Sequence, residues 1–227
     1  MRLKAKDGIK AAVPIMIGYF PVAMAFGILA KGGGLVFFET IGFSFILYAG
    51  ASQFIGVSMI IIGSGVGEIV LATLLLNFRH FFMSASLVQK LGHIQKSLRP
   101  ILGFFITDEV FSVASFQDGE ISESYLLSLE VLSYLSWVTG TAAGYIIGNF
   151  LPETLQVSMG IGLYALFVSI LVPELKKSSK AIVLALLAGG MNSLLRYVVK
   201  IPQGWSIVLS IVLISSIGVL IYGRADD

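Results

Sequence analysis

Apolar runs long enough to cross a membrane dominate the chain. Five stretches contain no Asp, Glu, Lys or Arg: residues 11–30, 40–67, 131–152, 154–173 and 201–223. About 20 apolar residues at a rise of 1.5 Å per residue span a hydrocarbon core of roughly 30 Å. The pattern predicts helices near residues 9–30, 40–62, 67–89, 99–117, 126–149, 155–173, 180–199 and 204–222.

The basic residues leave the number of spans open between seven and eight. Arg2, Lys4, Lys6 and Lys10 favour a cytoplasmic N-terminus. With eight spans, the basic residues at positions 176, 177, 180 and 224 also lie inside, but those at 90, 96 and 99 fall outside. One re-entrant or broken segment would give seven spans. The fold class is all-α: a polytopic helical membrane protein with seven or eight transmembrane helices.

Composition supports a single membrane domain. The chain has 227 residues, of which 56% are hydrophobic and 12% charged. That charged fraction is about half of the roughly 25% that is typical of soluble proteins. No polar extension is long enough to fold alone, so residues 1–227 are predicted to form one transmembrane transporter domain. The basic start runs into 20 apolar residues, which favours a retained first helix over a cleaved signal peptide.

Several kinds of chemistry are not expected. The chain has no Cys and two histidines, His80 and His93, which cannot form a metal site alone. No cofactor is predicted, and no P-loop is present that would let ATP drive this chain. The lysines lie in short loops rather than in a basic stripe, so nucleic acid is not an expected partner.

Two short similarities favour an internal repeat. Residues 14–20 resemble residues 100–105, and residues 48–51 resemble residues 137–141. They define repeat units 9–89 and 99–173. Units of three helices have opposite topology, and inverted repeats are a common transporter plan. Chance similarity between short apolar segments is the alternative.

Charged clusters occur at the middle of two predicted helices. Arg79-His80 lies at the centre of residues 69–89, and Asp108-Glu109 at the centre of residues 100–117. Charged side chains are costly at the bilayer centre, face the bundle interior and mark substrate or proton paths. Opposite signs at similar depth predict contact between the two helices. The alternatives are an ion pair that only locks the helices together, or a span boundary that puts Arg79 at the interface.

Roles can be assigned to these residues. Arg79 suits a substrate carboxylate, and Asn77 precedes it by two residues. A buried acid beside a like charge takes up a proton more readily, so Asp108 and Glu109 are candidates for proton coupling. His80, which titrates near neutral pH when unperturbed, is a third candidate. A satisfied hydrogen-bonding histidine and a helix-locking acid are the structural alternatives.

A polar segment in the second predicted helix supplies further candidates. Tyr48 and Ser52 are one turn apart, and Gln53 is an amide without a local partner. We predict that all three contact substrate. Polar residues also hold membrane helices together without any role in transport, and that is the alternative.

Proline and glycine mark two other helices. Pro14 and Pro21, with nearby glycines, make the first helix a candidate for kinking or unwinding around a cavity. Gly140, Gly144 and Gly148 form overlapping GxxxG steps, which allow close packing of helices, including that of a partner subunit.

By these residues the chain resembles the AzlC family, the large subunit of branched-chain amino acid exporters. The matching landmarks are the Pro/Gly-rich first helix and residues 48–54, 77–80, 107–109 and 137–141. The resemblance implies export of leucine, isoleucine, valine and analogues across the cell membrane, coupled to the proton gradient. It also implies a small AzlD-like membrane subunit.

Two other classes of function compete with a carrier. An intramembrane serine enzyme would need GxSxG, but residues 50–54 lack the last glycine, so no catalytic residue is predicted. A passive channel would need a filter motif, and none is present. We therefore predict a transporter rather than an enzyme.

Overall fold

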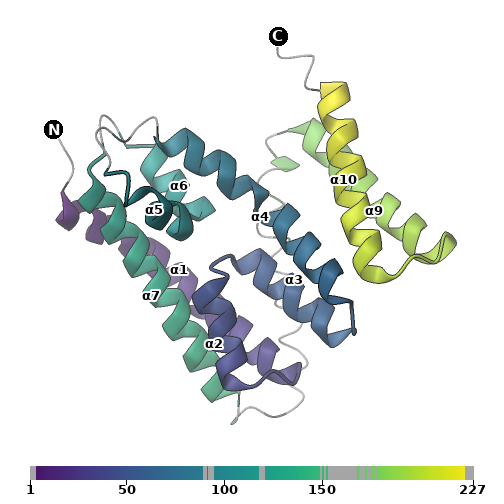
Figure 1. The fold of residues 1–227 in the computed structure, drawn as a ribbon, viewed down its shortest axis with the longest axis horizontal. Coiled ribbons are helices and arrows are strands. Elements are labelled where there is room, and N and C mark those ends of the chain that lie inside the picture. Colours follow the sequence, from purple (N-terminus) through teal and green to yellow (C-terminus); the bar gives the residue numbers. More distant parts are fainter. Residues whose placement is uncertain are drawn as a thin grey trace. The chain divides into compact units, whose positions relative to one another are not determined.

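The described part of the protein is helical. The computed structural model describes residues 4–88, 91, 95–117, 121–148, 150, 152, 168, 172, 175–176 and 178–222. The helices, shown in Figure 1, are α1 (Ala5–Gly32), α2 (Phe37–Ile46), α3 (Gly50–Ile61), α4 (Val66–Val88), α5 (Arg99–Phe105), α6 (Asp108–Ser115), α7 (Glu123–Ile147), α9 (Ser179–Ser193), the π-helical turn η1 (Leu194–Val198) and α10 (Gln203–Tyr222).

The predicted fold class is confirmed. Within the described residues, four helices are long and apolar enough to cross a membrane by themselves: Ala5–Gly32, Val66–Val88, Ser179–Val198 and Trp205–Tyr222. The predicted helix 155–173 lies almost entirely outside the described residues, so the choice between seven and eight spans stays open.

The chain divides into two compact units. The first contains residues 1–54 and 77–160, and the second contains residues 55–76 and 161–227. In the second unit α9 packs against α10, and Met59, Ala72 and Val208 form a small buried cluster. The predicted site residues all belong to the first unit. The single transporter domain and its two repeat units stay predictions.

Two helices that the sequence predicts as continuous are broken. Residues 40–62 form α2 and α3, which are separated at Leu47–Ala49, and residues 99–117 form α5 and α6, which are separated at Ile106-Thr107. Contacts from elsewhere in the first unit stabilise both breaks. The Tyr134 hydroxyl donates to the carbonyl of Phe45 (3.0 Å) at the end of α2, and the Tyr19 hydroxyl donates to Thr107 Oγ1 (2.7 Å) in the second break. The Thr107 hydroxyl also caps α6 locally by accepting from the Val110 amide (3.3 Å).

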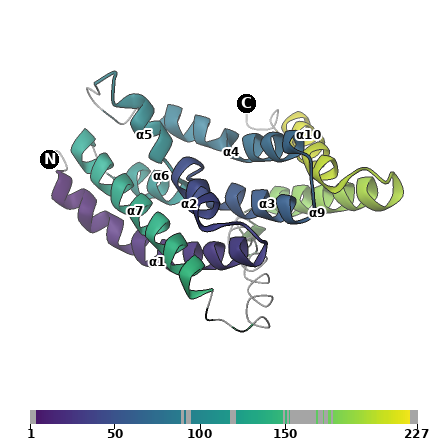
Figure 2. The ribbon, with the colours of Figure 1, turned by 60° about the horizontal axis from the view of Figure 1, so that its bottom comes forward.

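The first helix does not unwind. α1 is one helix over all 28 residues, with Pro14 and Pro21 inside it. Of the two predicted outcomes, unwinding is therefore wrong, and kinking stays a prediction. α7 packs along α1 over most of its length, as both views show, and this packing supports the helix across its prolines (Figures 1 and 2).

α1 and α7 run parallel. Tyr125 contacts Gly8, Ser136 donates to the carbonyl of Met16 (2.9 Å), and Tyr145 donates to the carbonyl of Leu35 (3.1 Å), so the contacts advance together along both helices. An odd number of spans must separate two parallel membrane helices. The number of spans between α1 and α7 is three, and therefore odd, if the α2–α3 pair, α4 and the α5–α6 pair each cross the membrane once.

The glycine strip of α7 faces α1. A Cβ at Gly140 would lie 2.6 Å from the carbonyl oxygen of Phe20, and one at Gly144 would collide with the backbone of Met24. The predicted close packing is confirmed, since both helices approach backbone to backbone here. The idea that Gly140 and Gly144 receive a partner subunit is wrong, because α1 already covers them.

Replacing Gly144 with alanine should destabilise the protein. The added methyl meets backbone atoms that cannot rotate away, and overpacking of this kind costs about 1–3 kcal/mol. For a chain of this size we expect the midpoint of thermal unfolding in detergent to fall by roughly 2–10 °C. Gly18→Ala on α1 is the matched control, because its Cβ would meet nothing within 4 Å. Equal midpoints for the two variants would contradict the tight contact.

Candidate functional site

An ion pair links α4 to the break between α5 and α6. Arg79 Nη1 lies 2.9 Å from Asp108 Oδ2, and the two side chains are 40% and 46% exposed. Asp108 is the first residue of α6, where the free amides of a helix N-terminus stabilise a negative charge. The predicted contact between the two charged clusters is confirmed. Both members of the pair are thus only partly covered by the rest of the protein.

The second acid of the cluster has a different partner. Glu109 Oε2 accepts a hydrogen bond from the Tyr19 hydroxyl (2.5 Å), which also lies 2.7 Å from Thr107 Oγ1. Adjacent residues on a helix point about 100° apart, which explains why Asp108 and Glu109 do not share Arg79. His80 lies within electrostatic reach of both Arg79 and Glu109.

Two further predicted residues contact each other. The Ser52 hydroxyl on α3 donates to Asn77 Oδ1 on α4 (2.7 Å). Ser52 is buried and Asn77 is partly exposed. This hydrogen bond connects the second half of one broken helix to α4 two residues before Arg79. Asn77, with Ser52 bonded to it, therefore lies close to Arg79 along the chain of α4, and the contact of both residues with substrate stays a prediction.

Both polar atoms of the Gln53 side chain have hydrogen-bond partners inside the protein. Its Nε2 donates to Ser44 Oγ (3.1 Å), its Oε1 accepts from Trp137 Nε1 (2.8 Å), and the side chain is completely buried. Ser44 in turn lies 2.7 Å from Thr141 Oγ1. The amide thus has the partners that the sequence did not reveal. Its contacts hold α2 and α3 against α7, and its contact with substrate stays a prediction.

Tyr48 lies in the break between α2 and α3. It is 5% exposed, and its hydroxyl makes no hydrogen bond to the described residues. Its ring packs edge-on against Tyr19 and Tyr134, with centroids 6.4 and 5.0 Å away. Tyr19 also packs edge-on against Trp137 at 5.3 Å. These aromatic side chains join the two helix breaks to α1 and α7.

Three residues of this region were not predicted from the sequence. Tyr19 is the link between Glu109 and the aromatic cluster, and its position between two prolines is the one local signal. Trp137 stands out in the sequence only as part of the family resemblance. Glu130 on α7 is fully buried, and neither of its oxygens has a hydrogen-bond partner in the described residues. An acid inside a predicted span is a signal that could have identified it.

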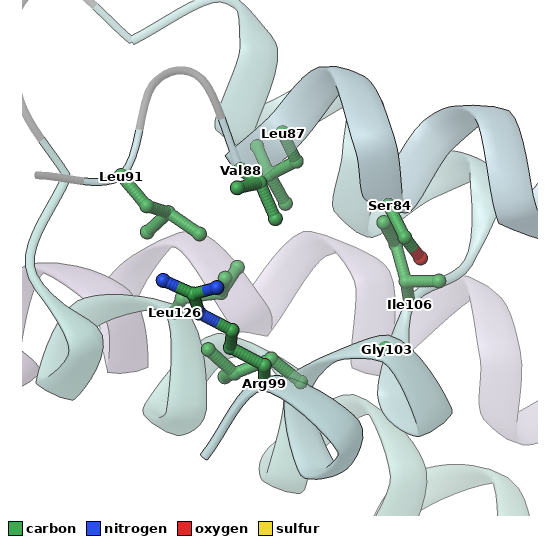
Figure 3. A pocket seen from close by; sticks show the side chains of 9 residues that line it. Ser84, Leu87, Val88, Leu91, Arg99, Gly103, Ile106 and Leu126 are labelled. Carbon is green, nitrogen blue, oxygen red and sulfur yellow. The ribbon is translucent and has the colours of Figure 1, made fainter. Parts of the chain in front are cut away.

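A small apolar cavity lies next to the break in the α5–α6 pair. Its volume is about 30 Å³, and Figure 3 shows its lining side chains, which come from α4, α5, α7 and the segments beside them: Ser84, Leu87, Val88, Leu91, Arg99, Leu102, Gly103, Ile106 and Leu126. Ser84 and Ile106 lie at one end, and Ile106 is two residues before Asp108. The cavity is thus an apolar neighbour of the charged group.

The fold and the site define a class. Broken helices whose ends meet buried polar side chains, within a bundle of apolar helices, are typical of membrane transport proteins. The AzlC protein family matches residues 14–151, and the chain belongs to this family. It is a multi-pass membrane protein.

Relatives in bacteria and archaea agree with this assignment. The chain is 34% identical to the inner membrane protein YgaZ of Escherichia coli over 82% of this chain and 79% of that protein. It is 35% identical to an uncharacterized membrane protein of Archaeoglobus fulgidus over 75% of this chain and 76% of that protein. It is 27% identical to the branched-chain amino acid transport protein AzlC of Bacillus subtilis over 74% of this chain and 66% of that protein. No solved structure gives a significant match.

Proposed function

We propose that this protein is a secondary transporter that exports branched-chain amino acids across the cell membrane. The family and the name of its Bacillus subtilis relative support the substrate class. The observation that carries the proposal is the accessible Arg79–Asp108 ion pair at a helix break. Such a pair offers both charges that a zwitterionic amino acid needs.

Binding can proceed by exchange of partners. The substrate carboxylate replaces Asp108 on Arg79, and its ammonium group replaces Arg79 on Asp108. Each of the four charges keeps a partner of opposite sign, so no unpaired charge is left in the low-dielectric interior. Asn77 and Ser52 lie beside Arg79 along α4 and α3 and can hydrogen-bond the bound carboxylate. The pair is thus closed when empty and opened by substrate.

The apolar cavity suits the substrate side chain. Its volume exceeds the roughly 10–15 Å³ that one water needs, and all its lining groups except Ser84 and Arg99 are apolar. Ser84 is five residues after Arg79, which is about 7.5 Å along a helix. We assign the branched aliphatic end of the substrate to this cavity.

Filling this cavity should change the substrate preference. A Cβ at Gly103 would lie 3.8 Å from Ser84 Oγ, so a side chain there enters open space without a clash. We expect Gly103→Val to lower leucine transport relative to alanine transport by about tenfold or more, the discrimination that one or two carbon atoms give. Competition between labelled leucine and unlabelled alanine measures it. Gly42→Val, where a Cβ also meets nothing, is the control. An unchanged preference would remove the cavity from the site.

Two finer parts of the proposal come from the family resemblance. Export is coupled to the proton gradient, and a small AzlD-like membrane subunit is required for full activity. The α1-facing glycine strip no longer supports a docking site for that subunit. Co-expression of this chain with and without such a subunit, followed by efflux from preloaded cells, tests the requirement. Full efflux from the single chain would contradict it.

Counterflow in proteoliposomes tests the function itself. Vesicles are preloaded with unlabelled leucine, isoleucine or valine, and uptake of labelled leucine is followed against its gradient. A carrier gives transient accumulation of label, while a passive channel gives only equilibration. An enzyme would change the labelled compound, which chromatography detects. Accumulation with preloaded lysine or glutamate but not with leucine would overturn the substrate class.

A further inference from the structure

Glu130 is a buried acid that the transport site does not use. It lies on α7 with 0% of its surface exposed, and Oε1 and Oε2 both lack a hydrogen-bond partner in the described residues. The flanking residues Leu126 and Leu129 are also fully buried. An acid in such surroundings contributes nothing to packing that a leucine would not provide.

The position of Glu130 points it toward the helix breaks. Residues 130, 134, 137 and 141 share one face of α7 by helical spacing. Tyr134 bonds to Phe45, Trp137 to Gln53 and Thr141 to Ser44, so this face packs against α2 and α3. Glu130 interacts electrostatically with Tyr48, whose hydroxyl is likewise buried and unbonded within the described residues.

An ionised carboxylate cannot stay in this place without a cation. Burial of an isolated charge is so costly that the group takes up a proton or binds a counter-ion instead. No described basic residue serves as a counter-ion for Glu130. Arg79 pairs with Asp108, and Lys31 lies over the ring of Tyr145, far along α7. The other described basic residues on or beside the helices that pack against α7 donate no hydrogen bond to Glu130: Lys4, Lys6, Lys10 and Arg99. The described acids there carry the wrong charge for a counter-ion: Asp7, Glu39, Asp108 and Glu109.

We propose that Glu130 is the internal proton-binding site of the transporter. The route we propose runs from the exposed Glu109 by way of the hydroxyls of Tyr19 and Tyr48. Glu109 and Tyr19 are hydrogen-bonded, and the ring centroids of Tyr19 and Tyr48 lie 6.4 Å apart. The Tyr48 hydroxyl and Glu130 are both buried and unbonded within the described residues, so the two transfers through Tyr48 require it to move into hydrogen-bonding distance of Tyr19 and of Glu130. This inference rests on the proposed function, since it deepens the coupling of that same site.

The transfer balances without a further reactant. Glu109 takes a proton from solvent, and each tyrosine oxygen accepts one proton and releases its own to the next group. Glu130 receives the last proton and becomes neutral. Glu109 and both tyrosines end as they began, so the net change is one proton taken from solvent and one charge lost at Glu130. A proton needs one oxygen, whereas a hard metal cation needs several, and the carboxyl and one hydroxyl here suit the proton.

The test measures protons and amino acids in the same proteoliposomes. A pH-sensitive dye inside the vesicles reports substrate-driven proton movement, and labelled leucine reports counterflow. We expect Glu130→Gln to lower the rate of substrate-driven proton movement by about 100-fold or more, the contribution typical of a positioned acid or base, while counterflow of leucine continues. Glu130→Asp keeps the acid and should keep measurable proton movement. Tyr48→Phe should slow it, because the relay hydroxyl is gone.

A second measurement does not depend on transport. The infrared spectrum of the purified protein should contain the C=O band of a protonated carboxylic acid, and Glu130→Gln should remove it. Ser133→Ala is the matched control on the same buried helix, since the Ser133 hydroxyl only bonds to the carbonyl of Leu129. It should leave both the band and the proton-to-leucine ratio unchanged.

The outcomes separate this inference from the proposed function. If the wild-type protein gives no counterflow with branched-chain amino acids, the proposed function fails. If counterflow is present and Glu130→Gln moves protons at the wild-type ratio, or keeps the infrared band, the inference fails alone. If Glu130→Gln does not fold, an infrared C=O band that Glu130→Asp leaves unshifted, together with an unaffected Tyr48→Phe, overturns it.

Discussion

Replacing Arg79 with alanine is expected to reduce transport of branched-chain amino acids by roughly 10- to 150-fold. Hydrogen bonds to charged groups contribute about 1.5–3 kcal/mol, and each 1.4 kcal/mol is a factor of ten. Arg79 forms such a bond with Asp108 in the empty protein, and in the proposed mechanism with the substrate carboxylate. Counterflow of labelled leucine measures the loss, and the protein recovered after size-exclusion chromatography shows whether the variant folds.

Two further variants interpret the result. Arg196→Ala removes an arginine in the second unit whose guanidinium bonds only weakly to the carbonyl of Ile201 (3.5 Å), and it should transport normally. Arg79→Met combined with Asp108→Leu removes both charges together. If the pair serves only to lock the helices, single variants misfold and the double variant folds and transports. Wild-type transport by Arg79→Ala would remove this residue from the site.

The helices could be predicted because membrane thickness sets their length, but the breaks could not. Neither Leu47–Ala49 nor Ile106-Thr107 contains a proline, while α1 continues through Pro14 and Pro21. The breaks depend on partners remote in sequence, such as the hydroxyl of Tyr134 at the end of α2 and that of Tyr19 beside Thr107. Local sequence rules describe one helix, whereas these contacts belong to the assembled bundle.

The charged part of the site was predictable because the membrane constrains charged residues as it constrains helix length. Arg79 and Asp108 are costly in a membrane unless they pair, so their depth alone indicated a contact. The neutral part was not, because tyrosine, tryptophan and serine occur throughout membrane helices for packing alone. Gln53 illustrates this, since its partners Ser44 and Trp137 are 9 and 84 residues away. Glu130 was overlooked because it precedes the uncharged run 131–152.

The two adjacent acids are expected to have separate roles. Sequence alone gives Asp108 and Glu109 one role, but their partners differ: Arg79 for the first and Tyr19 for the second. We expect Asp108→Asn to lose counterflow by roughly 10- to 150-fold, because both Arg79 and the substrate ammonium lose a charged partner. Glu109→Gln keeps an acceptor for the Tyr19 hydroxyl but cannot carry a proton. It should therefore lose proton-driven efflux and the response to external pH.

Efflux from preloaded proteoliposomes with an imposed pH gradient distinguishes these cases. In the wild-type protein a protonophore should abolish gradient-driven efflux of leucine, and Glu109→Gln should show the low rate with or without it. Glu68→Gln, an acid-to-amide change at the start of α4, is the control and should respond as the wild type does. Identical phenotypes for Asp108→Asn and Glu109→Gln would contradict the division of roles. Efflux that ignores the protonophore and requires sodium would overturn the proton mechanism while leaving transport itself in place, because the binding step at Arg79 and Asp108 needs no proton.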